Sequence, residues 1–154
     1  MKINAFLSIF ICNCKIMGQS YTYRCEYCGY EEHFNEGHGF LIHSQPLEQY
    51  LNSGIKLFHY KIHRLLIKLA KQYDGLFIQA GFKVYKCPKC KLLYDKIEVK
   101  VYNDKEIIHK SDFRCSVCGT RLKLTNIHRL KNAICPVCHN KTFKIEYENF
   151  KLWA

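Results

Sequence analysis

The stretch Cys25-Glu26-Tyr27-Cys28-Gly29 is the first of four Cys-x-x-Cys motifs that decide the fold of this chain. Two residues between the cysteines allow a tight turn, here called a knuckle, that points both sulfur atoms at one ion. Two knuckles that face each other complete a tetrahedron, so the four motifs predict two zinc ions in Cys₄ sites. The eight predicted ligands are Cys25, Cys28, Cys87, Cys90, Cys115, Cys118, Cys135 and Cys138.

The spacing of the motifs indicates how they pair. Sixteen residues separate Cys118 from Cys135, which is enough for the short hairpin of a zinc ribbon. Fifty-eight residues separate Cys28 from Cys87, so by elimination the first two motifs form the other site, with a subdomain inserted between them. Spacing alone also permits the crossed arrangement, in which the first motif shares a site with a C-terminal one.

Glycine and proline beside the motifs favour metal binding over other uses of paired cysteines. Gly29 and Gly119 follow the second cysteine of a motif, where the turn often needs positive φ. Pro88 and Pro136 fix φ where the turn begins. A thioredoxin-like redox motif normally occurs once, ahead of a helix, and a disulfide framework predicts an exported protein. We therefore prefer zinc to either alternative.

The charge of the chain is unevenly distributed. The formal net charge is +11, and the eight thiolates and two Zn²⁺ ions would add −4 and leave +7. Residues 17–50 hold one basic and five acidic residues, whereas residues 51–154 hold twenty-one basic and eight acidic ones. A basic C-terminal two-thirds is compatible with a phosphate-backbone partner, and also with solubility alone.

The first sixteen residues faintly resemble a signal peptide, with a charged start and an apolar run. The run is too short to span a membrane, and no small-x-small cleavage site follows it. We expect translation to begin at Met17 and residues 1–16 to be a non-native extension, so that Cys12 and Cys14 have no structural role. On this interpretation the protein is cytoplasmic.

The remaining patterns predict a small α+β fold of mostly antiparallel strands. One amphipathic helix is expected from Ile55 to Tyr73, where apolar residues recur at steps of three and four. Strands are expected on both sides of each knuckle, and a short helical turn over 46–52. The expected domains are 17–103, a zinc ribbon with the helix inserted, and 104–154, a second zinc ribbon.

The expected helix carries a row of basic residues opposite its apolar face. The row consists of Lys61, Arg64, Lys68 and Lys71. Such a row can lie along a nucleic-acid backbone, although a solvated helix face is the commoner explanation for it.

Histidine is the other candidate for chemistry. His59 and His63 are four residues apart on one helical face, but no glutamate lies between them as in a metalloprotease motif. His38 and His43 could join Glu36 in a second, weaker metal site. We prefer surface imidazoles for all eight histidines. No catalytic triad or phosphate-binding glycine loop can be placed, so we expect no enzyme.

From Met17 the chain runs MGQSYTYRCEYCGY, with Gly37-His38-Gly39-Phe40 further on and Lys151-Leu152-Trp153 at the other end. This pattern resembles a group of small, uncharacterised prokaryotic zinc-ribbon proteins. The resemblance implies a start at Met17 and metal ligation by the eight cysteines, and it brings no activity.

Together these observations favour a zinc-binding module that associates with nucleic acid or with the transcription or translation machinery. The alternative is a protein–protein adaptor with purely structural zinc, whose contact surface is the apolar segment Phe40 to Leu51. The sequence indicates no membrane partner and no small-molecule substrate.

Overall fold

The computed structural model describes residues 18–130 and 133–153, so the expectations for residues 1–16 lie outside the described chain. It confirms a small α+β protein with two antiparallel sheets and one main helix. The elements are β1 (Gly18–Cys25), β2 (Glu31–Glu36), β3 (Gln45–Pro46), α2 (Leu47–Asn52), α3 (Tyr60–Gln72), β4 (Phe77–Lys86), β5 (Leu93–Tyr102), β6 (Ile107–Lys110), β7 (Lys123–Leu124), the 3₁₀ turn η1 (Ile127–Arg129) and β8 (Phe143–Trp153). No helix within these residues has both the length and the apolar composition needed to cross a bilayer.

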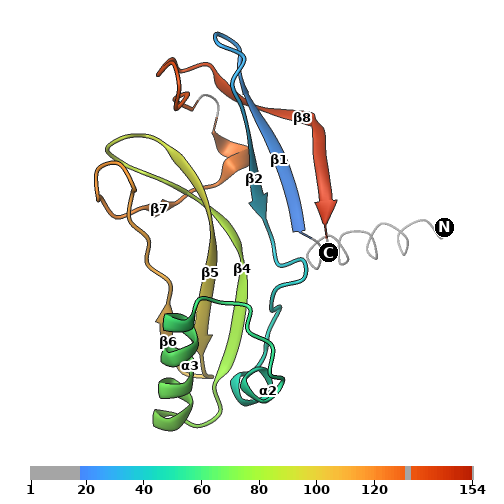
Figure 1. Cartoon of the computed structure of the whole chain (residues 1–154), viewed down its shortest axis with the longest axis vertical. Coiled ribbons are helices and arrows are strands. Elements are labelled where there is room, and N and C mark those ends of the chain that lie inside the picture. Colours follow the sequence, from blue (N-terminus) through green and yellow to red (C-terminus); the bar gives the residue numbers. More distant parts are fainter. Residues whose placement is uncertain (1–17, 131–132, 154) are drawn as a thin grey trace, which may run out of the picture. The chain divides into compact units, whose positions relative to one another are not determined.

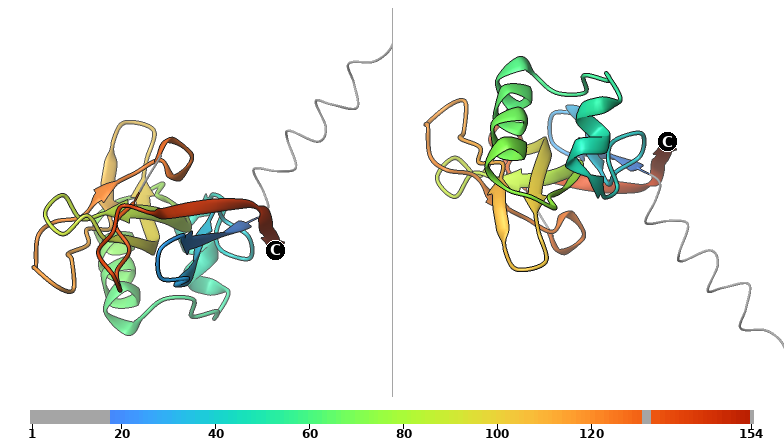
Figure 2. Two further views of the ribbon diagram at one scale, coloured as in Figure 1. Left: turned by 90° about the horizontal axis from the view of Figure 1, so that it is seen from above. Right: turned by 90° about the horizontal axis from the view of Figure 1, so that it is seen from below.

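The first sheet joins the two ends of the described chain. Its strand order is β2-β1-β8, so β1 lies between β2 and β8 (Figure 1), and Figure 2 shows β8 running along β1 from above. The second sheet has the order β3-β4-β5-β6, and β7 pairs with β4. In the first sheet Cys25 is the register partner of Phe143, which places the first knuckle beside the start of β8.

The chain divides into two compact units. The first contains the described parts of Met1–Phe40 and Asp112–Ala154 together with Phe82–Ile97, and the second contains Leu41–Gly81 and Glu98–Ser111. All eight motif cysteines therefore lie in the first unit. This division differs from the expected boundary near residue 103. Asn103 instead makes the turn between β5 and β6, where its Oδ1 accepts hydrogen bonds from the backbone N–H groups of Lys105 and Glu106.

Two apolar clusters of described residues contribute to the core of the first unit, and each contains motif cysteines. The larger cluster packs Tyr23 edge-on against Phe34, with their ring centroids 5.4 Å apart, and the buried Tyr23 hydroxyl donates to the Ile127 carbonyl. The larger cluster consists of Tyr21, Tyr23, Cys25, Phe34, Val84, Leu93, Ile127, Ala133, Cys135 and Phe143. The smaller cluster consists of Tyr85, Cys87, Cys115 and Leu122.

The second unit contains no cysteine and depends on an ordinary apolar core. Helix α3 buries Leu66 and Leu69, and α2 buries Leu47 and Tyr50. The helix is shorter than the apolar periodicity predicts, because residues 55–59 are not helical. His59 ends the irregular segment as the N-cap, with an extended ψ of 147° and a side chain that accepts a hydrogen bond from the Lys61 N–H.

Trp153 occupies a space in the first unit that two glycines leave open. Its indole packs against Phe82 and Phe40, with ring centroids 5.4 and 5.6 Å apart. A Cβ atom placed on either Gly18 or Gly39 would overlap the indole ring. Both positions therefore require glycine for close approach, which gives a physical reason for the glycines that precede Ser20 and Phe40.

Gly18→Ala is expected to destabilise the first unit by about 1–3 kcal/mol, because the new methyl group overlaps the Trp153 ring in a packed site. Thermal and denaturant unfolding measure the change. Gly54→Ala is the control, since a Cβ there meets nothing within 4 Å. The double variant Gly18→Ala/Trp153→Leu should be more stable than the single variant Trp153→Leu, so that part of the stability lost with the indole is recovered. Independent, additive effects of the two substitutions would contradict the proposed contact.

Candidate metal centres

The structure gathers the eight motif cysteines into two groups of four. Cys25 and Cys28 lie with Cys135 and Cys138, whereas Cys87 and Cys90 lie with Cys115 and Cys118. In each group the four sulfur atoms lie within 4.8 Å of one another. The pairing predicted from spacing, first motif with second and third with fourth, is therefore wrong. The chain instead nests one site inside the other, which is the crossed arrangement that spacing permitted.

The reason for the nested pairing lies in the strands that enter the knuckles. Lys86, the last residue of β4, pairs with Lys123 of β7, so the second knuckle is held beside the third. Cys25, the last residue of β1, pairs with Phe143, and Phe143 forms a further bridge to Ala133. The two backbone hydrogen bonds between Ala133 and Phe143 hold the fourth knuckle beside the first. Strand pairing therefore overrides the short distance along the chain between the third and fourth motifs.

The spacing of the sulfur atoms fits a bound tetrahedral ion. Cys25 Sγ lies 3.6 Å from Cys138 Sγ, and Cys87 Sγ lies 3.5 Å from Cys118 Sγ. Sulfur atoms at about 2.3 Å from one ion at the corners of a tetrahedron are about 3.8 Å apart. A disulfide would bring the atoms to about 2.05 Å, and all eight cysteines are free. The geometry therefore supports two metal-binding Cys₄ sites and gives no support to a disulfide framework.

The four knuckles share one backbone conformation. In each, the N–H of the residue after the second cysteine donates to the carbonyl of the first cysteine, at 2.9–3.0 Å. That residue has positive φ in every knuckle, from 60° to 75°. The four residues in this position are Gly29, Lys91, Gly119 and His139. Glycine was expected at two of these positions, and the structure shows that the other two hold the same turn with a side chain present.

Burial follows the same repeat. The first cysteine of each motif is buried, at 0–3% exposure, and the second is more accessible in all four. Each buried sulfur belongs to one of the two apolar clusters, so the centres are anchored in the core on one side and reach the surface on the other. A Cys₄ site of this kind is coordinatively closed and leaves no position for a substrate.

Polar side chains that spacing did not identify support the sulfur atoms. Thr142 Oγ1 lies 3.1 Å from Cys25 Sγ, and the Tyr94 hydroxyl lies 3.2 Å from Cys115 Sγ. Thr120 Oγ1 is 3.1 Å from Cys118 Sγ, and Asn140 Nδ2 donates to Cys138 Sγ. Thr120 and Asn140 both stand two residues after the second cysteine of their motif, so a polar residue there is the signal that could have identified them. Such groups orient metal ligands and tune their basicity.

These contacts and the close approach of the sulfur atoms shift the pKa values of cysteines in the same site in opposite directions. Hydrogen bonding from Thr120 lowers the pKa of the Cys118 thiol to about 6. Hydrogen bonding with Cys118, together with burial, raises the pKa of Cys90 to about 12. A metal ion that binds all four sulfurs at neutral pH must therefore displace a proton from Cys90, so acid weakens metal binding.

The histidines do not join either centre. Among the described residues only the two cysteine groups bring three or more metal-ligating side chains together. His59 caps α3, and Glu36 forms an ion pair with His128, with Nε2 and Oε2 3.4 Å apart. The alternative metal site considered around Glu36, His38 and His43 is therefore not assembled among the described residues. The basic row is present, with Lys61, Arg64, Lys68 and Lys71 all exposed on α3.

The nested pairing predicts a specific pattern of metal loss. Cys28→Ser and Cys138→Ser should each remove about one metal ion per chain, and the double variant should lose no more, because both residues serve one site. Cys28→Ser/Cys118→Ser should lose both ions. Elemental analysis of freshly reduced protein measures the content. Loss of both ions from Cys28→Ser/Cys138→Ser would show that the pairing is different.

The shared turn predicts opposite effects for two kinds of substitution. Lys91→Gly and His139→Gly should stabilise their metal centres by about 1 kcal/mol, because each removes a side chain from a left-handed position. Gly29→Ala and Gly119→Ala should destabilise by a similar amount, since a Cβ there meets nothing within 4 Å and only the backbone cost changes. Competition with a chelator, in which 1 kcal/mol is about a five-fold change in affinity, measures all four. If Lys91→Gly and His139→Gly both destabilised the metal centres, the assignment of backbone strain to these two positions would be wrong.

Comparison of the chain with protein-family models, with curated proteins and with solved structures gives no match. The resemblance to small prokaryotic zinc-ribbon proteins accordingly stays a prediction, and a role for this protein has to be inferred from its own geometry.

Proposed function

We propose that this protein is a zinc-binding, non-enzymatic module that binds nucleic acid, or an assembly of the transcription or translation machinery, through α3. The proposal has two parts. The metal ions are zinc and hold the first unit together. The basic face of α3 contacts phosphate groups.

Zinc is supported by the chemistry of the donor set. Four thiolates in a tetrahedron suit Zn²⁺ and iron, whereas hard ions such as Mg²⁺ and Ca²⁺ take oxygen ligands. The donors are anchored in apolar clusters, so metal binding and packing of the first unit are coupled. Elemental analysis should find zinc, and the purified protein should be colourless. Visible absorption from iron–thiolate charge transfer would assign the sites to iron instead.

The observation that carries the nucleic-acid proposal is the uncompensated charge of α3. The helix contains four basic residues and no acidic one. All four are exposed, and none forms an ion pair with another described residue. They span eleven residues from Lys61 to Lys71, so the first and last lie about 15 Å apart along the helix axis. An unneutralised row of this length is suited to successive phosphates of one strand.

An exposed aromatic side chain stands at the start of the basic row. Tyr60 is 59% exposed, and its ring lies beside that of His59, tilted by 46° with the centroids 4.4 Å apart. Accessible aromatic rings next to a basic track are the usual arrangement for stacking on unpaired bases. The pair therefore favours a single-stranded segment as the partner of α3.

The adaptor alternative loses most of the surface on which it depended. Within the segment Phe40 to Leu51, the side chains of Leu41, Ile42, Leu47 and Tyr50 are buried in the structure. Phe40 remains exposed, at 63%. A segment whose apolar side chains already fill the core cannot offer them to a partner.

Replacing Lys61, Arg64, Lys68 and Lys71 together by Gln should leave folding intact, because all four are exposed. Binding to single-stranded oligonucleotides should weaken for every sequence alike. The slope of log affinity against log salt should flatten by about three units, because each phosphate contact on a single strand contributes about 0.7 units and four contacts are lost. Fluorescence anisotropy over a salt series measures both quantities.

A control with the same charge change separates a defined face from bulk attraction. Lys89, Lys105, Lys123 and Lys141 are also exposed and form no ion pair with another described residue. Their replacement by Gln should have a much smaller effect. Equal losses from both sets would refute α3 as the binding face, and so would an absence of binding by the unaltered protein at moderate salt.

A further inference from the structure

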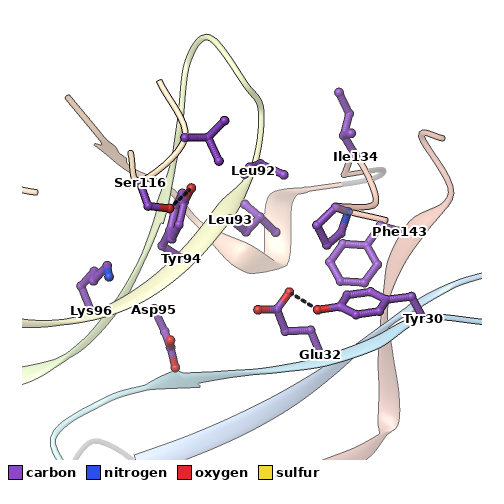
Figure 3. Close-up of a pocket in the computed structure, with 12 residues that line it drawn as sticks. Tyr30, Glu32, Leu92, Leu93, Tyr94, Asp95, Lys96, Ser116, Ile134 and Phe143 are labelled. Atoms are coloured by element: carbon purple, nitrogen blue, oxygen red, sulfur yellow. Dashed lines mark hydrogen bonds between the residues drawn. The ribbon is translucent and has the colours of Figure 1, made fainter. Parts of the chain in front are cut away.

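The first unit contains a cavity of about 310 Å³ whose walls come from the knuckles (Figure 3). Leu92 and Leu93 follow the second knuckle, and Ser116 and Val117 belong to the third. Pro136 belongs to the fourth, and Tyr30 follows the first. The other lining residues are Glu32, Tyr94, Asp95, Lys96, Ile134 and Phe143. Formation of this cavity therefore depends on the nested pairing of the motifs.

Aromatic rings and aliphatic groups make up much of the lining. In Figure 3 Tyr94 stands on one side of Leu93, and Tyr30 and Phe143 stand on the other. The Tyr94 hydroxyl contacts Cys115 Sγ at 3.2 Å and Ser116 Oγ at 3.2 Å, which fixes the ring in place. The cavity thus combines flat aromatic walls with polar groups, and the aromatic walls suit the stem or the planar face of a ligand.

Two carboxylates lie at one side of the cavity without a cationic partner. Asp95 accepts two hydrogen bonds from Asn35 at 2.9 Å, and Glu32 accepts one from the Tyr30 hydroxyl at 3.4 Å. No lysine, arginine or histidine of the described chain forms an ion pair with either carboxylate. Burial raises the pKa of Glu32, and the nearby charge of Asp95 acts in the same direction. A bound cation would relieve both effects.

The surroundings of the cavity are negatively charged as well. Four thiolates around a divalent ion leave each metal centre with a net charge of −2, and the cavity contacts knuckles of both centres. Lys96 is the one cation among the lining residues, and its ammonium group lies over the Tyr94 ring, 5.5 Å from the centroid. A protein with a formal charge of +11 therefore has an open cavity with an excess of negative charge.

We propose that this cavity is a binding site for an organic cation, a guanidinium or ammonium group carried on an apolar stem. The cationic group pairs with Glu32, and the stem lies between the rings of Tyr94 and Tyr30. Cations of this class are recognised by carboxylates and by aromatic faces together. The site is independent of the proposed contact between α3 and nucleic acid, because all of its residues belong to the first unit.

The test uses the metal-loaded full chain and three probes. Agmatine represents a free amine, an N-acetylated and C-amidated Gly-Arg-Gly peptide represents a partner's side chain, and the same peptide with citrulline is the neutral control. Calorimetry and amide chemical shifts of Leu93 and Ser116 measure binding. We expect saturable binding of agmatine or the arginine peptide. Preference for agmatine assigns the site to small amines, and preference for the peptide assigns it to a protein partner.

Variants then connect binding to the cavity. Glu32→Gln keeps an acceptor for the Tyr30 hydroxyl and should weaken binding by about ten-fold or more, the effect of losing one charge-assisted hydrogen bond. Lys96→Gln should strengthen it, because it removes the competing cation. Glu148→Gln, at an exposed carboxylate, should change nothing. Equal binding of the citrulline peptide, no effect of Glu32→Gln, or no saturation up to about 10 mM of either cation would overturn the proposal.

Discussion

Convergence of four cysteine sulfur atoms at one place is the constraint on which the first unit depends. A single knuckle presents only two sulfur atoms, so each centre needs a second knuckle from elsewhere in the chain. Strand pairing brings the knuckles together without a metal ion. Cys25 is paired with Phe143, and Lys86 is paired with Lys123. Metal binding and strand pairing therefore stabilise the same arrangement. Neither a strand nor a site can be lost without affecting the other.

This arrangement also explains why the two units differ in composition. The first unit buries the first cysteine of every motif in its apolar clusters, so a bound metal ion would supplement its core. The second unit has no cysteine and buries leucine, isoleucine and valine side chains around α3 instead. Because α3 needs only one face for this packing, its other face is free to carry four basic residues. The proposed division of roles follows from this difference: metal-supported structure in one unit and a basic surface in the other.

The organic-cation cavity is a consequence of the same topology. Many of its lining residues, such as Tyr30, Leu92 and Ser116, stand within two residues of a cysteine in the sequence, and they come from all four knuckles. The Tyr94 hydroxyl connects the cavity to a metal centre through Cys115, so a ligand and a metal ion would share one supporting residue. Four thiolates around a divalent ion would carry a net charge of −2, and the carboxylates of Glu32 and Asp95 would add to that charge.

The sequence alone determined the local chemistry of this protein. The Cys-x-x-Cys spacing identifies the eight sulfur ligands because a knuckle is a four-residue turn, and the three- and four-residue period identifies α3 because a helix repeats locally. What only the tertiary structure decided is which knuckles meet. The sixteen residues between Cys118 and Cys135 are long enough for a hairpin, but Lys123 and Leu124 pair with β4 and Ala133 pairs with Phe143, so that segment is committed to two different neighbours. The spacing of the cysteines does not reveal which distant strands pair. Because the cavity is formed by that pairing, the sequence could not predict the cavity either.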